Sequence, residues 1–396
     1  MHVLSIVYAP VWGGPQNRVA NVARDLAPHG VRTTVLLPEE GTDSIRRMRE
    51  RGTVDVVAMP LHRMRATRDP AVHREYLSAL RREVPAIADL VRDLGVDVVD
   101  TNSLPNLHGG LAARRADVAC VWELIESNSP LPFRVGFAPL VLTLADVVMS
   151  TGVKIAAAHP GVTRLGDRWV TFFPSVDLDV FRPDAALRAQ ARAELGFGPD
   201  DVVIGNVANI NPAKGHRWFL RAAADVRRTH PHARFVILGG THEGHERFYA
   251  DLWAERDALG LGDDVLTVVD PGPRVNVLAQ GFDVFWLTSE PRSEGIPNAI
   301  GEAKGLQLPV VATDVGSVSE AVTDGISGIV VPPRDPAAIA DATRPLLDDP
   351  ALRARLGRAG RQEALTQYAS HVGAEAHRLA FERAVAHHAA RRRRTG

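Results

Sequence analysis

The chain has 396 residues, which is too long for one ordinary core and long enough for two domains. Apolar residues make up 45% of it and charged residues 23%, a composition that excludes a disordered chain. The formal net charge of −1 argues against a nucleic-acid-binding protein, and a single cysteine, Cys120, excludes a disulfide framework and a cysteine-rich metal site.

The amino-terminal run 1–7 is apolar but short, and it lacks a basic flank and a small-residue cleavage site. We therefore predict a first strand there rather than a signal peptide. No apolar run approaches the length of a membrane span, so we expect a cytoplasmic protein.

In the first half of the chain, short apolar runs alternate with longer amphipathic stretches such as 18–29 and 71–94. This alternation predicts βαβ units that build a parallel sheet. Strands are expected at 3–8, 31–37, 54–59, 96–99, 119–125 and 147–150, and the pattern resets at 169–174.

The pattern restarts after a proline-marked linker at 176–183, and the stretch from Pro336 onward is predicted to be helical. It ends in Arg391–Arg394, for which we expect a frayed, solvated tail. Strands of the second half are expected at 202–210, 234–238, 265–269, 284–288, 310–313 and 328–331.

These patterns predict an α/β protein made of two doubly wound, Rossmann-like domains that face each other across a cleft. The predicted first domain covers 1–175, the linker 176–183 and the second domain 184–365. The remaining residues, 366–396, are expected to form a helix that packs back towards the first domain. Ligands of such sheets bind beyond the carboxyl ends of the strands.

The segment from Glu294 to Glu302 contains the strongest candidates for ligand-binding residues. A strand is expected to end near Ser289, and a helix to start with Pro297 at its first position, where a missing N–H costs nothing. The free N–H groups of residues 298–300 then form an anion site suited to a diphosphate. The two glutamates flank that site and can accept hydrogen bonds from sugar hydroxyls. An ordinary capped surface helix is the alternative.

Three further loops support this interpretation, although each is a weak signal alone. Lys214 lies in a loop after a predicted strand, where its charge can meet a phosphate. Gly316 follows the strand at 310–313, and Gly13 and Gly14 join the first strand to a helix. Because glycine has no side chain, the backbone can approach a ligand at both places. The dinucleotide fingerprint G-x-G-x-x-G is absent.

Taken together, the run 294–302, the Lys214-Gly215 loop, the segment 308–316, the linker and the Gly13-Gly14 loop resemble the retaining glycosyltransferases of family 4. The resemblance spans nearly the whole chain and implies a GT-B fold. It also implies transfer of a sugar from a nucleoside diphosphate, with UDP expected, to a hydroxyl group. The family retains the anomeric configuration and requires no metal or other cofactor.

The resemblance also assigns roles to residues of the donor site. Glu294 is implied to contact the donor sugar hydroxyls, Glu302 the ribose hydroxyls, and Lys214 the diphosphate; Glu294 and Lys214 are therefore the catalytic candidates. The segment 269–274 is implied to hold the base. The remaining donor-side candidates are Gly13, Gly14, Asn209, Asp270, Arg274, Gly295, Ile296, Pro297 and Asn298.

Two positions depart from the family pattern. The family has Arg where this chain has Asn209, and Asn cannot make a bidentate charged contact with a diphosphate. The family also often has His where we place Ile125. The candidates for the acceptor side, each of which can equally be structural or solvent-facing, are Asn17, His108, Glu123 and Glu126.

Arginines are concentrated between residues 46 and 74, in the region that borders the acceptor in this fold. A solvated, arginine-rich surface is one interpretation. An anionic acceptor, or contact with an acidic membrane surface, is the other. The arginines are Arg46, Arg47, Arg49, Arg51, Arg63, Arg65, Arg68 and Arg74.

We therefore predict a glycosyltransferase whose acceptor is a small molecule, a lipid-linked compound or a saccharide. Alternatives on the same fold are a nucleotide-sugar epimerase and a sugar phosphorylase. A catalytically silent subunit that binds a nucleotide sugar and supports a partner is an alternative from another class, and Asn209 and Ile125 are the residues that favour it.

Overall fold

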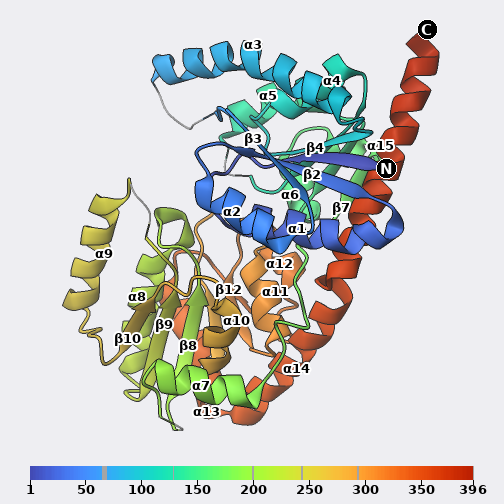
Figure 1. Ribbon diagram of the computed structural model, residues 1–396. Helices are drawn as coiled ribbons and strands as arrows, with labels where there is room; N and C mark the ends of the chain where they lie inside the picture. Colours follow the sequence, from blue (N-terminus) through green and yellow to red (C-terminus); the bar gives the residue numbers. More distant parts are fainter. Residues whose placement is uncertain (65–68, 128, 199, 242–243, 292–293, 396) are drawn as a thin grey trace. The chain divides into compact units, whose positions relative to one another are not determined.

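The computed structural model describes residues 1–64, 69–127, 129–198, 200–241, 244–291 and 294–395. The chain divides into two compact units (Figure 1). Unit 1 comprises residues 1–175 together with 370–396, and unit 2 comprises residues 176–369. Among the described helices, none is long and apolar enough to cross a membrane.

Unit 1 is built on a parallel sheet with the strand order β3-β2-β1-β4-β5-β6-β7. The order reverses between β1 and β4, so the loops that follow these two strands diverge at the carboxyl edge of the sheet. The strands are β1 (His2–Ile6), β2 (Arg32–Pro38), β3 (Asp55–Met59), β4 (Val98–Asn102), β5 (Ala119–Leu124), β6 (Val147–Ser150) and β7 (Trp169–Thr171).

Helices cover both faces of this sheet. One face packs against α1 and α15, and the other against α3, α4, α5 and α6. The helices of unit 1 are α1 (Gly14–Leu26), η1 (Ala27–His29), α2 (Thr42–Arg51), α3 (Pro70–Asp93), α4 (His108–Ala116), α5 (Leu131–Leu144), α6 (Val153–Ala158), η2 (Val162–Arg164), η3 (Gly166–Arg168) and α15 (Ser370–Thr395).

Unit 2 repeats the architecture with a six-stranded parallel sheet in the order β10-β9-β8-β11-β12-β13. Its strands are β8 (Val202–Val207), β9 (Ala233–Leu238), β10 (Leu266–Val269), β11 (Val284–Leu287), β12 (Val310–Thr313) and β13 (Gly328–Val331). Its helices are α7 (Ala185–Glu194), η4 (Pro212–Lys214), α8 (His216–Arg227), α9 (Glu246–Ala258), α10 (Val275–Leu278), η5 (Ala279–Gly281), α11 (Asn298–Gly305), α12 (Val318–Ala321), α13 (Pro336–Asp348) and α14 (Pro350–Gln367).

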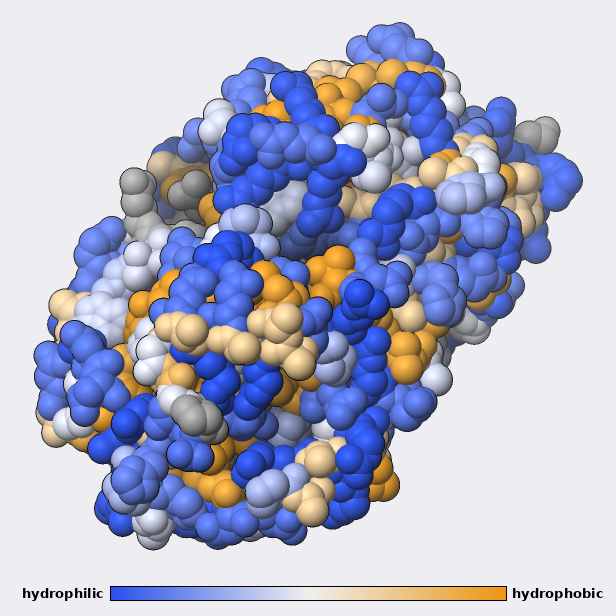
Figure 2. All heavy atoms as spheres, turned by 60° about the horizontal axis from the view of Figure 1, so that its bottom comes forward, coloured by the Kyte–Doolittle hydropathy of each residue, from blue (hydrophilic) through white to orange (hydrophobic). Residues whose placement is uncertain are grey.

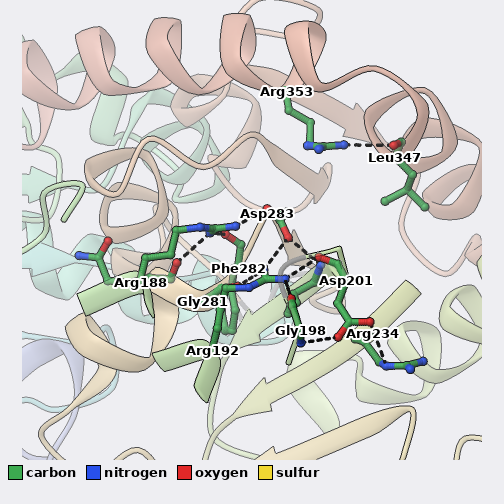
Figure 3. Close-up of polar contacts among 12 residues, drawn as sticks. Arg188, Arg192, Gly198, Asp201, Arg234, Gly281, Phe282, Asp283, Leu347 and Arg353 are labelled. Atoms are coloured by element: carbon green, nitrogen blue, oxygen red, sulfur yellow. Dashed lines mark hydrogen bonds and ion pairs between the residues drawn. The ribbon is translucent and has the colours of Figure 1, made fainter. Parts of the chain in front are cut away.

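The amino edge of the sheet in unit 2 carries a cluster of ion pairs, drawn in Figure 3. Asp283, just before β11, pairs with Arg188 at 2.7 Å and with Arg192 at 3.2 Å. Arg192 also donates to the carbonyl oxygens of Gly198 and Asp201, which precede β8. This cluster ties α7 to two central strands, and it leaves the opposite, carboxyl edge for ligands.

The fold class predicted from the sequence is confirmed, because both units are parallel, Rossmann-like sheets and each predicted strand is present within a few residues. The prediction of a frayed basic tail is wrong. The chain is helical through Thr395, since Arg391 pairs with Asp146 at 2.8 Å and Arg392 pairs with Asp117 at 3.1 Å. Cations at a helix carboxyl terminus are also favoured by its dipole.

Candidate functional site

The candidate site lies at the carboxyl edge of the sheet in unit 2, where three adjacent strands end. β8, β11 and β12 are neighbours in the sheet, and all three run in parallel. Lys214 follows β8, Glu294 follows β11 and Gly316 follows β12. The parallel sheet therefore brings together loops that are far apart in the sequence.

Lys214 and Glu294 form an ion pair, with 2.6 Å between Nζ and Oε1. The Glu294 side chain is only 8% exposed, whereas that of Lys214 is 28% exposed. Ser289 Oγ donates to the same Glu294 oxygen at 2.7 Å, and Thr313 Oγ1 donates to the carbonyl of Ser289 at 2.9 Å. The result is a buried carboxylate that is held by a cation which solvent can still reach.

Two glycines let the loops approach this closely. A methyl group on Gly215 would lie 1.9 Å from the carbonyl oxygen of Thr288, and one on Gly316 would lie 1.9 Å from that of Glu294. Both glycines also have positive φ, at +66° and +54°. Only glycine satisfies both requirements without displacing backbone.

The helix α11 begins one residue later than predicted. Pro297 is its N-cap, with an extended ψ of 135°, and not its first helical residue. The backbone of Glu294 and Gly295, which precedes this N-cap, lies against the Gly316 turn. Ser317 N donates to Gly295 O there, at 3.0 Å. The predicted free N–H of Ile300 donates instead to Pro297 O at 3.2 Å. The amides of the first turn, at Asn298 and Ala299, remain the anion-binding candidates.

Glu302 lies within α11, eight residues after Glu294. It is half-buried, and the burial of its carboxyl group raises the pKa from 4.5 to about 7. Its neighbours Gly301 and Ala303 are buried, so α11 is fixed against the body of unit 2 and holds Glu302 in place.

Asn209 lies on the loop after β8 and is exposed. This loop ends at His216, which the sequence reasoning missed. His216 is fully buried at the start of α8, and burial lowers its pKa to about 4. A neutral histidine is therefore packed into the core directly after Lys214 and Gly215. From the sequence, Ser289 was expected only to end a strand, whereas its side chain donates to Glu294.

Asp270 and Arg274, the predicted base-binding residues, follow the edge strand β10. Asp270 Oδ1 accepts from Gly272 N at 2.9 Å and shapes the turn. Arg274 makes a two-pronged ion pair with Glu194 at 2.8 and 2.6 Å. Two strands separate β10 from β11, so this pair of residues does not join the cluster around Glu294.

In unit 1, Gly13 and Gly14 start α1, with Gly13 as the N-cap. The Gln16 side chain accepts from Gly13 N at 3.1 Å and donates to Ala9 O at 2.7 Å, which fixes the loop after β1. Asn17 Oδ1 accepts from Arg51 at 2.7 Å. These residues therefore form an ordered turn at the carboxyl edge of the sheet in unit 1.

Glu123, a predicted acceptor-side residue, lies inside unit 1 with a side-chain exposure of 1%. It pairs with Arg18 at 2.5 Å and with His377 of α15 at 3.0 Å. Burial acts to raise the pKa of Glu123, but the charge of Arg18 and the hydrogen bond from His377 outweigh it and lower the pKa. Glu123 is thus occupied in attaching α15 to the sheet.

The other acceptor-side candidates are also held within unit 1. His108 is fully buried, pairs with Glu83 at 3.0 Å, and has a pKa lowered to about 4 by burial. Ile125, at the position where the family often has His, packs against the apolar cluster beside α15. Glu126 is half-buried in the loop after β5. Burial and pairing thus leave Glu126 and Asn17 as the more accessible of the four.

The arginines between residues 46 and 74 are partly paired. Arg46 contacts Asp43 at 2.6 Å and Glu50 at 2.7 Å, and Arg47 contacts Asp43 at 2.8 Å. Arg47 and Arg51 also lie over the ring of Trp12, at 5.9 and 5.2 Å. Arg65 and Arg68 fall outside the described residues.

The chain is similar to a known protein family and to several known proteins. Residues 201–349, which include Lys214, Glu294 and Glu302, match the family model described as glycosyl transferases group 1. The D-inositol 3-phosphate glycosyltransferase of Acidothermus cellulolyticus is 31% identical over 375 residues, which cover 87% of this chain and 80% of the relative.

A GDP-mannose-dependent alpha-(1-6)-phosphatidylinositol monomannoside mannosyltransferase of Mycolicibacterium smegmatis is 34% identical over 203 residues, 49% of this chain and 51% of that protein. Among solved structures, Anabaena HepE in complex with UDP-glucose has a TM-score of 0.80 at 18% identity, covering 96% of this chain and 98% of that one. A glycosyltransferase from Rickettsia africae has a TM-score of 0.79 at 17% identity, covering 97% and 98%.

Proposed function

Because this chain belongs to the group 1 glycosyl transferases, we propose that it transfers a sugar from a nucleoside diphosphate sugar, with UDP as the nucleotide, to an acceptor hydroxyl with retention of configuration. A glycosyltransferase with a GT-B fold and a nucleotide-sugar donor follows from the family. The proposal adds four points to this: that the nucleotide is UDP, that the configuration is retained, that the chain is a member of family 4, and that the reaction needs no metal.

The observation that carries the proposal is the pair of Lys214 and Glu294 beside the first turn of α11. A diphosphate that enters this site meets one cation and the amides of a helix N-terminus, both of which favour negative charge. The sugar then lies against Glu294, whose carboxylate accepts hydrogen bonds from hydroxyls. Glu302 then accepts hydrogen bonds from the ribose hydroxyls.

In the proposed reaction the bond between the anomeric carbon and the diphosphate oxygen breaks, and its electron pair stays on that oxygen. Lys214 and the α11 amides stabilise the charge as it develops, which is electrostatic catalysis. The acceptor hydroxyl attacks the same face of the sugar, and its proton passes to an oxygen of the leaving diphosphate. Glu294 positions the sugar and forms no bond to it.

We propose an anionic polyol as the acceptor, either a free inositol phosphate or the inositol headgroup of a lipid. The names of the two relatives give an inositol phosphate and a phosphatidylinositol mannoside as their acceptors. In this chain, Arg51 lies beside Asn17 at the start of α1, where a phosphate on the acceptor would find a cation.

The proposal is tested by incubating the protein with UDP- and GDP-sugars, each with inositol phosphate, with unphosphorylated inositol or with no acceptor. We expect a glycosylated inositol phosphate with the α configuration from an α-linked donor, read by the anomeric coupling in NMR. Turnover should continue in EDTA. An inverted product, a changed sugar without acceptor, or activity that EDTA abolishes and magnesium restores would each contradict part of the proposal.

A further inference from the structure

The helix α5 of unit 1 presents an uncharged, apolar face to solvent. Leu131 and Val135, one turn apart, are 56% and 52% exposed, and Leu140 is 38% exposed. Pro132, Gly136 and Pro139, which lie on the same side of the helix, are exposed as well. A helix of a globular protein normally turns polar residues to this side.

The single ionisable residue of α5 points away from that face. Arg134 donates to the carbonyl oxygens of Ser129 at 3.1 Å and Ala158 at 2.5 Å, and so fastens α5 to α6. Phe133 is 41% exposed and stacks on Phe137, with 5.7 Å between the ring centroids. By contrast, the surface drawn in Figure 2 is mostly hydrophilic, with apolar residues in small groups.

The segment that contains α5 is also depleted in acids. Residues 127–166 include one acidic residue, Asp146, although the chain has 47 acids in 396 residues. Asp146 is buried and pairs with Arg391. The exposed ionisable residues that border α5 on α6 and η2 are cations, Lys154 and Arg164. On η3, the exposed Asp167 pairs with His387 of α15 at 3.2 Å. An apolar face whose exposed border on α6 and η2 is cationic complements an anionic lipid surface.

A second copy of the chain is the competing occupant. The large exposed apolar side chains of α5 are four, Leu131, Phe133, Val135 and Leu140, whereas a stable protein–protein interface uses roughly 20–30 residues and buries roughly 800 Å² on each partner. A cationic border on both copies also opposes self-association. A bilayer needs neither a large area nor a complementary shape.

We propose that α5 is a membrane-contact helix that inserts its apolar face into the headgroup region of an anionic bilayer, with Lys154 and Arg164 against the lipid charges. This inference goes beyond the proposed function, because it concerns where the protein resides and not what it transfers. Vesicle binding requires no turnover, so the two ideas can fail separately.

The test is co-sedimentation with vesicles of phosphatidylglycerol and phosphatidylcholine in equal parts. We expect the whole protein to bind, and the triple variant Leu131→Gln, Val135→Gln and Leu140→Gln to bind at least about tenfold more weakly, since apolar area drives insertion. These side chains are exposed and Gln is a good helix former, so the fold should persist. Pure phosphatidylcholine vesicles should also bind more weakly.

A matched control replaces Leu77 on α3 and Leu365 on α14 with Gln, because these leucines are 57% and 41% exposed and lie outside α5. The control should bind vesicles like the unmodified protein, and all variants should keep the same UDP affinity. The proposal is overturned if the unmodified protein does not bind vesicles or if the triple variant binds equally well. A dimer in sedimentation velocity that the triple variant converts to monomer would also overturn it, in favour of self-association.

Discussion

Lys214 and Glu294 serve as each other's counterion, so each charge depends on the other. The carboxylate is buried and also accepts from Ser289, whereas the lysine is partly exposed. Removing the lysine alone would leave a buried carboxylate with one neutral hydrogen bond. The pair therefore has two separable functions, one in stability and one in donor binding.

We predict that Lys214→Ala loses nearly all turnover and also unfolds more easily, by about 1–3 kcal/mol, because Glu294 keeps a buried charge without its partner. The double variant Lys214→Ala with Glu294→Gln should recover most of the stability and none of the donor affinity. Urea unfolding and UDP titration distinguish these effects. If the double variant stays as unstable as the single one, the unpaired charge of Glu294 is not the cause of the lost stability.

Glu302 gives a prediction on pH. Burial raises its pKa from 4.5 to about 7 in the folded protein. Between these values the unfolded chain has released the proton and the folded chain still holds it, so rising pH favours unfolding through this window. Relative to Glu302→Gln, the unmodified protein should thus lose stability from about pH 4.5 to about pH 7 and then level off. Urea unfolding of both proteins across this range checks the sign, and a constant difference would contradict it.

At the scale of elements, the site depends on the contact between the loop after β11 and the loop after β12. Gly316 makes this contact possible, because its positive φ and lack of a side chain let it lie against the carbonyl of Glu294. The same loops hold the N-cap of α11, so their separation displaces both the carboxylate and the helix terminus.

Gly316→Ala should therefore lower both donor affinity and stability, because the added methyl group has to displace the backbone of Glu294. Gly325→Ala is the matched control, since its φ is +72° and nothing lies within 4 Å of the added methyl group. The control should cost only the strain of a left-handed residue, about 1 kcal/mol, and leave donor affinity unchanged. Equal losses of donor affinity in the two variants would show that strain, and not the close contact, is responsible.

The strands were predictable because a buried parallel strand is a short, continuous apolar run, as at 310–313. The contact of Lys214 with Glu294 was not derivable from spacing, since 80 residues separate them. The family resemblance implied only that both residues belong to the donor site. Ser289 and His216 were missed because a single polar residue at a strand or loop end has no periodic signal. The pairing of Glu123 with His377 could not be predicted from the sequence, because 254 residues separate them.

At the scale of the whole molecule, the two units differ in how their cores are completed. Unit 2 is continuous in the sequence, and its main core cluster contains only its own residues. Unit 1 is discontinuous, because α15 supplies Ala374, Ala380, Phe381 and Ala384 to a core cluster beneath β1, β4, β5 and β6. The buried pair of Glu123 with His377 adds a polar attachment to that helix.

We predict that the fragment 176–369 folds cooperatively by itself and binds UDP, because its main core cluster contains only its own residues and it carries Lys214, Glu294 and the first turn of α11. The fragment 1–175 should not fold stably, since it leaves the apolar face under α15 exposed to water. Adding a synthetic peptide of residues 370–396 should restore its folded circular dichroism spectrum. A stable fragment 1–175 without the peptide would contradict this view of α15.

The discontinuity of unit 1 has a consequence for biosynthesis. Residues 1–175 leave the ribosome before unit 2, yet one face of their sheet is covered in part by α15, which is translated after unit 2. Unit 2 emerges complete while unit 1 still waits for its final helix, so the second half can reach its native state before the first. During that interval the uncovered part of the sheet is a natural binding surface for chaperones, and ribosome stalling within codons 370–396 would leave it exposed.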